Sequence, residues 1–153
     1  MTVLCNPYLN FDGKAREALT FYKGVFGGEL EINTFGETPG AMHPGLTPDN
    51  VMHGMLRGDK NVVLMAADAN PEMNLPPSTT AISLSGEDDA TLRGYFEALS
   101  EGASDLLPLN QAPWGDTFGM LTDKFGIPWM VNILGPQHGA DASAEAAGAT
   151  EQG

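Results

Sequence analysis

The chain contains two copies of one short pattern, and this repeat constrains its fold more than any other feature. The triplet Gly-Met-Leu occupies residues 54–56 and again residues 119–121, which is 65 positions later (119 against 54). An Asp-Lys pair follows each triplet, at 59–60 and at 123–124, and an apolar run follows each pair. This period is too long for a solenoid unit and suits one supersecondary module used twice. The sequence therefore predicts a pseudo-symmetric fold with a cleft where the two copies meet.

Each half of the chain contains one amphipathic helix. Apolar residues recur at three- and four-residue steps over residues 15–26 and again over residues 92–99. This spacing gives each helix a single apolar stripe. The expected N-terminal caps are Asp12 for the first helix and, at capping-box spacing, Ser85 and Asp88 for the second.

The remaining patterned segments predict strands on both sides of each helix. The expected strands are 8–11, 29–35, 51–56 and 62–67 in the first half, and 81–85, 104–109, 117–122 and 128–134 in the second. Each half then runs strand, helix, strand, strand, strand. The predicted fold class is α+β, with two tandem βαβββ modules at about residues 3–67 and 79–134.

Composition indicates one domain, residues 1–135, with a short tail. A chain of 153 residues with 42% hydrophobic residues can fill a core. Residues 136–153 contain almost no apolar residue besides alanine, so a flexible tail is expected there. A single cysteine, Cys5, rules out an internal disulfide, and the first residues lack the features of a secretory signal. We therefore expect a cytoplasmic protein, with Cys5 as a small buried hydrophobe.

The charge balance excludes two classes of partner. The formal net charge is −13, with only seven Lys and Arg residues. Such a chain is repelled by nucleic acid and by anionic membranes, because both are bound through basic side chains. No stretch approaches the ~20 apolar residues of a membrane span. We therefore expect neither nucleic acid nor a membrane among its partners.

Residues 12–28 resemble the first-helix motif of the vicinal oxygen chelate superfamily, which includes glyoxalase I, bleomycin-resistance proteins, fosfomycin-resistance enzymes and extradiol dioxygenases. Residues 8–11, together with 114–132, resemble its PhnB-like branch. The resemblance implies two modules whose strands curl into a half-barrel around a cavity, and a homodimer. Some PhnB-like proteins carry a methyltransferase label. The chain has no Gly-x-Gly-x-x-Gly turn to hold a nucleotide cofactor, so we do not expect that activity.

The same resemblance allows a test for a metal centre. Catalytic members hold a divalent metal with four cavity-facing side chains, from the first and last strands of both modules. Carried over, these positions are Met65 and Met130 in the last strands, Asn6 or Tyr8 in the first, and Thr80 or Ala81 in the fifth. None is a histidine or a carboxylate, and methionine suits soft ions such as Cu(I). We therefore expect no metal at the usual positions and no other cofactor.

Strand alternation identifies the side chains that line the predicted cavity. In the last strand, residues 127, 129, 131 and 133 are expected to pack on the helices, which leaves the even-numbered residues inside. The predicted ligand-binding residues are Tyr8, Asn10, Met65, Trp114, Met130 and Asn132. The alternative for the two methionines is ordinary core packing, and for Trp114 a buried position beside a Gly-Asp turn.

His53 and Asp116 are the candidate catalytic residues. His53 lies on a predicted strand, and histidine is the residue type most often used as a general base or a ligand donor near neutral pH. The alternative is a structural role, in which the half-buried His53 side chain is hydrogen-bonded to the backbone. Asp116 is the only carboxylate that we pair with His53, because acid–base catalysis uses two groups with separated pKa values.

Three functions follow from this pattern. The first, which we favour, is a PhnB-like protein that binds a small molecule in the cavity between its modules, without the usual metal. The second is a metal-dependent lyase or isomerase of glyoxalase type, with a shifted ligand set around His53. The third is an interaction dimer with no small-molecule role. The sequence leaves open whether the protein is an enzyme.

Overall fold

A computed structural model describes residues 2–70 and 80–135. The chain divides into two compact units, Met1–Pro77 and Ser78–Gly153, and each is described by itself. The predicted flexible tail, residues 136–153, lies outside the described residues. Within the described ranges, no helix has the length and apolar character needed to cross a membrane.

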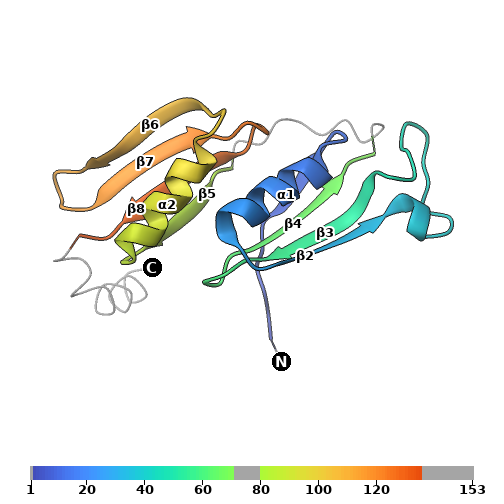
Figure 1. Cartoon of the computed structure of the whole chain (residues 1–153), viewed down its shortest axis with the longest axis horizontal. Helices are drawn as coiled ribbons and strands as arrows, with labels where there is room; N and C mark the ends of the chain where they lie inside the picture. Colours follow the sequence, from blue (N-terminus) through green and yellow to red (C-terminus); the bar gives the residue numbers. More distant parts are fainter. Residues whose placement is uncertain (1, 71–79, 136–153) are drawn as a thin grey trace. The chain divides into compact units, whose positions relative to one another are not determined.

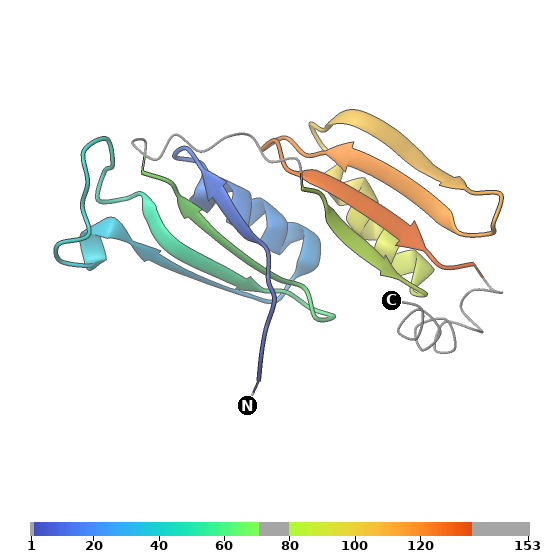
Figure 2. The ribbon, with the colours of Figure 1, turned by 180° about the vertical axis from the view of Figure 1, so that it is seen from behind.

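The first unit is a four-stranded sheet with one helix on one face (Figure 1). Its strands lie in the order β1-β4-β3-β2, with β1 parallel to β4 and the other neighbours antiparallel. Its elements are β1 (Tyr8–Phe11), α1 (Ala15–Phe26), β2 (Glu29–Thr34), the short 3₁₀ helix η1 (Phe35–Glu37), β3 (Val51–Arg57) and β4 (Val63–Asp68). In the reverse view the sheet lies in front of α1, and no helix of residues 2–70 covers the face that it presents (Figure 2).

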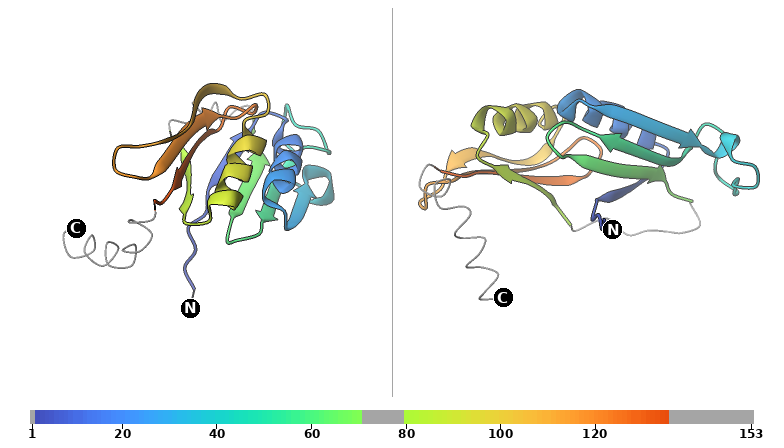
Figure 3. Two further views of the ribbon diagram at one scale, coloured as in Figure 1. Left: turned by 60° about the vertical axis from the view of Figure 1, so that its left-hand side comes forward. Right: turned by 90° about the horizontal axis from the view of Figure 1, so that it is seen from below.

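The second unit repeats this arrangement. Its strand order is β5-β8-β7-β6, again with one parallel pair, β5 and β8. Its elements are β5 (Ile82–Gly86), α2 (Asp89–Leu99), β6 (Ser104–Gln111), β7 (Thr117–Thr122) and β8 (Pro128–Ile133). Figure 3 shows each helix on one side of its own sheet. The predicted α+β class and the two βαβββ modules are confirmed.

The repeated glycine of the Gly-Met-Leu triplets lies where each helix packs on its sheet. A Cβ atom at Gly54 would collide with Leu19 of α1, and one at Gly119 would lie 2.9 Å from Cε2 of Phe96 in α2. Real Cβ contacts are longer than this, so only glycine lets each helix approach so closely. The two glycines therefore identify the helix-covered face of each sheet.

The alternation predicted for the last strand is confirmed. Trp129, Val131 and Ile133 of β8 are all buried, at 3% exposure or less. The strand before α2 begins at Ile82 and ends at Gly86, one residue later than predicted. Cys5 was wrongly placed among the buried hydrophobes, because it precedes β1 and is exposed.

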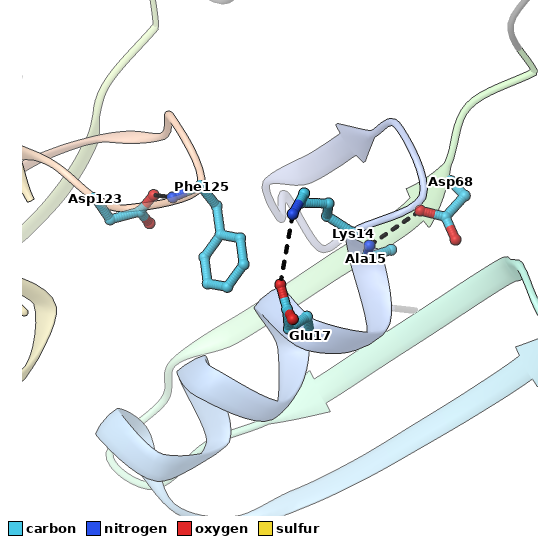
Figure 4. A network of polar contacts seen from close by, with 6 residues as sticks. All are labelled: Lys14, Ala15, Glu17, Asp68, Asp123 and Phe125. Carbon is cyan, nitrogen blue, oxygen red and sulfur yellow. Dashed lines mark hydrogen bonds and ion pairs between the residues drawn. The ribbon is translucent and has the colours of Figure 1, made fainter. Parts of the chain in front are cut away.

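The predicted start of the first helix is wrong, and the cause is a distant side chain. Asp12 does not cap α1; the helix begins at Ala15, and the Ala15 N–H donates to Oδ1 of Asp68 at 3.0 Å (Figure 4). In the second unit Asp88 alone caps α2, accepting from the Thr91 N–H at 3.2 Å. Ser85 lies inside β5 and takes no part.

Candidate functional site

The helix-free face of the first sheet brings together most of the residues predicted for the first module. Because Gly54 faces α1, its strand neighbours His53 and Met55 point to the opposite side. Strand register places Met55 opposite Met65, and Met65 beside Tyr8 of β1. We call this set the first open face: Tyr8, Asn10, His53, Met55 and Met65.

Tyr8 and His53 are in direct contact on the first open face. The Tyr8 hydroxyl lies 3.4 Å from Nδ1 of His53, and the ring centroids are 5.8 Å apart at an interplanar angle of 33°. Partial burial raises the pKa of the Tyr8 hydroxyl above its ordinary value. The two rings thus form a small platform with a neutral phenol at neutral pH.

The raised pKa of Tyr8 gives a prediction on pH. Desolvation opposes the phenolate, so the folded-state pKa lies above the unfolded one, and the contribution of Tyr8 to stability is lost as pH rises past the unfolded value of about 10. The difference in absorbance near 295 nm between the native chain and Tyr8→Phe should titrate above the value of free tyrosine. A difference curve that titrates at or below that value would contradict the burial of Tyr8.

The second sheet has an equivalent open face with different side chains. Met120 lies opposite Met130, as Met55 lies opposite Met65 in the first unit. The register partner of Met130 on β5 is Ser83, so neither Thr80 nor Ala81 holds the position predicted from the resemblance. We call this set the second open face: Ser83, Phe118, Met120, Met130 and Asn132.

Asp116 lies at the end of the second open face and is held by its own unit. It is 3% exposed, and it accepts from the Gly135 N–H at 2.9 Å and from Nδ2 of Asn132 at 3.2 Å. These bonds join the start of β7 to the end of β8. His53 and Asp116 belong to different units, so their pairing in catalysis stays a prediction.

Trp114 is not buried, which removes the alternative placement that the sequence allowed. Its side chain is 64% exposed in the turn between β6 and β7, next to Gly115. An exposed indole can contact a ligand, and the ligand-binding role of Trp114 stays a prediction.

The described residues do not fit the divalent metal of the superfamily. Within residues 2–70 and 80–135 no group of three or more His, Cys, Asp or Glu side chains is arranged to hold a metal ion. The positions carried over from the superfamily are occupied by Tyr8, Met65, Ser83 and Met130. Phenol, hydroxyl and thioether groups make a poor site for zinc, nickel, manganese or iron.

A polar hollow of about 590 Å³ lies elsewhere on the first unit, around the start of α1. Asp12, Lys14, Asp49, Asn50 and Asp68 are among its lining residues. The buried acceptor, Asp68, uses both oxygens for N–H groups of its own unit. We therefore assign this hollow a structural role, as the surface around the N-terminus of α1 that Asp68 caps.

Met55 and Met120 were missed as open-face residues by the sequence analysis. The signal was present in the repeated triplet, because a methionine that follows the helix-facing glycine must point to the other side. Each of them is the cross-strand partner of a methionine that was predicted.

Comparisons with known proteins agree with this architecture. A family model described as 3-demethylubiquinone-9 3-methyltransferase matches residues 4–132. The solved structure of protein PA1353 from Pseudomonas aeruginosa is 37% identical, with a TM-score of 0.73 over 86% of this chain and 98% of that one. A Bacillus cereus structure described as a putative 3-demethylubiquinone-9 3-methyltransferase, PhnB protein, is 25% identical, with a TM-score of 0.66 over 86% of this chain and all of that one.

A further relative matches over nearly its full length. Protein YjdN from Escherichia coli (strain K12) is 27% identical over 143 residues, which cover 86% of this chain and 96% of that protein. The family model and these relatives all span both βαβββ units. The chain belongs to the family described as 3-demethylubiquinone-9 3-methyltransferase, whose model matches most of its length.

Proposed function

We propose that this chain is a cytoplasmic small-molecule-binding protein that works as a homodimer without the hard divalent metal of the catalytic superfamily members. The observation that carries this proposal is the first open face, where Tyr8 and His53 are in contact beside the Met55–Met65 pair. Neutral hydrogen-bonding groups among aromatic and thioether surfaces are ordinary ligand-pocket chemistry. The ligand we expect is apolar or aromatic, with a few neutral polar groups.

The charge of the chain narrows this ligand class. A strongly anionic ligand would need a cluster of Arg or Lys, and the first open face has none. Arg57, at the far end of β3, is ion-paired with Glu31 at 3.4 Å. With a formal net charge of −13, the protein as a whole favours neutral or cationic molecules.

Metal analysis followed by ligand screening tests the proposal. Protein grown with zinc, nickel, manganese and iron, and purified without a histidine tag, should contain far less than one divalent metal per chain. A thermal-shift screen of neutral and cationic aromatic compounds should then give a stabilising ligand, because binding to the folded state alone raises its melting temperature. Near-stoichiometric metal would instead support the lyase or isomerase alternative around His53.

Variants link a screening hit to the first open face. Tyr8→Ala and Met65→Ala should each weaken its binding about tenfold or more, because each removes a large part of the contact surface. Glu97→Gln, on the exposed side of α2, is the matched control and should bind as the native chain does. Tight binding of S-adenosylmethionine with methyl transfer would overturn the proposal in favour of the activity in the family description.

A further inference from the structure

Three side chains with soft donor atoms share the first open face. His53 and Met55 lie two residues apart on β3, so their side chains leave the sheet on the same side. Met65 lies directly opposite Met55 on β4. All three are neither fully buried nor fully exposed, so a solute can reach them.

We propose that His53, Met55 and Met65 bind a soft monovalent cation, Cu(I). The site would consist of one imidazole nitrogen and two thioether sulfurs, all from the first unit. This inference goes beyond the proposed small-molecule function and does not depend on it. It also differs from the superfamily's metal centre in its ion, its donors and its position on a single sheet.

The strand register brings the three donors within reach of one ion. Side chains directly opposite on antiparallel strands have Cβ atoms about 4.5–5.5 Å apart. Residues two apart on a strand are separated by roughly 7 Å. Methionine has three rotatable side-chain bonds, so both sulfurs can turn toward the imidazole without movement of the backbone.

Tyr8 orients the histidine for this role. Its hydroxyl contacts Nδ1 of His53, which leaves Nε2 as the nitrogen available to an ion. A metal-bound histidine usually donates its other ring N–H to an oxygen, and this contact fixes the ring and its tautomer. With an ion on Nε2, Nδ1–H donates to the phenol oxygen of Tyr8.

The donor set selects the class of ion. Thioether sulfur and neutral imidazole suit Cu(I), whereas magnesium, calcium and manganese prefer oxygen ligands. The flanking charges are balanced, because Glu31 and Arg57 are paired with each other at 3.4 Å. A monovalent cation is also favoured by the net charge of the chain.

The repeat supplies an internal control. The second open face has the same methionine pair, Met120 opposite Met130. At the place of His53 it has Phe118, and at the place of Tyr8 it has Ser83. The second open face, as the described residues form it, therefore has two thioethers and no imidazole, and it should bind the ion much more weakly.

Silver(I), which is redox-inert, is the probe for the test. The full chain carries Cys5→Ser, because the exposed thiol of Cys5 would otherwise compete for a soft ion. Its eight methionines are labelled with carbon-13 at the methyl group and followed by NMR. We expect the Met55 and Met65 signals to shift first and to saturate near one equivalent, before those of Met120 and Met130.

Single variants in the same background identify the donors. Met65→Leu and His53→Phe should each weaken silver binding about tenfold or more, because each removes one donor. Met130→Leu, the matched change in the second unit, should leave the affinity unchanged. His53→Gln guards against a packing effect of the phenylalanine, and amide NMR spectra check that each variant is folded.

Two results would overturn the proposal. One is an equal response of the two methionine pairs, or a first response at Met42 in its exposed loop. The other is silver affinity that His53→Phe and His53→Gln both leave intact. A Cu(I) titration against a chromophoric chelator under ascorbate should reproduce the order of the variants. Small-molecule binding is measured on metal-free protein, so the two proposals fail independently.

Discussion

Asp123→Ala is expected to lower the free energy of unfolding by about 3–5 kcal/mol. Asp123 is 2% exposed in the turn between β7 and β8, and both of its oxygens accept hydrogen bonds. Oδ1 accepts from the backbone N–H groups of Phe125 at 2.8 Å and Ile127 at 3.0 Å, and Oδ2 accepts from Nε1 of Trp129 at 2.8 Å. The first of these bonds is drawn in Figure 4.

The size of this effect follows from the three N–H donors that lose the Asp123 carboxylate as their acceptor. Alanine provides no acceptor, so two backbone N–H groups and the indole N–H lose a partner at once. A buried donor without a partner costs about 1–3 kcal/mol. Trp129 is itself 1% exposed, so water cannot replace the lost carboxylate without opening the core. The measurement is urea denaturation, followed by tryptophan fluorescence and by far-ultraviolet circular dichroism.

Asp59→Ala is the matched control, since Asp59 and Asp123 begin the two Asp-Lys pairs of the repeat. Asp59 is exposed in the turn between β3 and β4, so its loss should change stability by no more than about 0.5 kcal/mol. The loss of stability in Asp123→Asn should lie between those of Asp59→Ala and Asp123→Ala, because an amide keeps one acceptor oxygen. Equal losses for Asp59→Ala and Asp123→Ala would contradict the role assigned to the buried carboxylate.

The repeated triplets hold equivalent places in the two units, but the two Asp-Lys pairs do not. The triplets recur at 65 residues but the Asp-Lys pairs at 64, so the pairs are one position out of register. The structure explains the difference: the N–H of Gly58 donates to the Val62 carbonyl at 2.7 Å, and the N–H of Asp123 donates to the Ile127 carbonyl at 2.9 Å. Asp123 therefore occupies the place of Gly58. The resemblance of the pairs is in sequence only.

The fold could be predicted because its determinants are local and repeated. Helix periodicity, strand alternation and the two turns each lie within a short stretch of chain. The same alternation correctly separated Trp129 and Val131, which are buried, from Met130 between them. The position of Ser83 opposite Met130 could not be predicted in this way, because strand register depends on pairing between segments far apart in the chain.

The start of the first helix was mispredicted for the same reason. A local cap, Asp12, was expected, whereas the acceptor for the Ala15 N–H is Asp68, which lies 53 residues further along the chain. A buried aspartate at the end of an apolar strand is an uncommon feature, because carboxylates are rarely buried without several partners. Asp68 ends the run that contains Met65, so this signal was visible in the sequence.

Asp68→Ala should therefore destabilise the first unit by about 3–5 kcal/mol. Asp68 is 4% exposed, and it joins three parts of the first unit. Oδ1 accepts from the N–H of Ala15, while Oδ2 accepts from the N–H of Val51 at 2.9 Å and from Nδ2 of Asn50 at 3.2 Å. Its loss leaves the first turn of α1 and the first residue of β3 without an acceptor, and removes a favourable negative charge from the helix N-terminus.

Asp12→Ala is the control for this variant, because it removes the residue that the sequence predicted as the cap. Asp12 is exposed and lies before the helix, so we expect a change of no more than about 0.5 kcal/mol. Hydrogen exchange distinguishes the two: Asp68→Ala should speed exchange along α1 and at Val51, whereas Asp12→Ala should not. If Asp12→Ala gave the larger loss, the helix would be capped locally, and the link between α1, β3 and β4 through one buried carboxylate would be refuted.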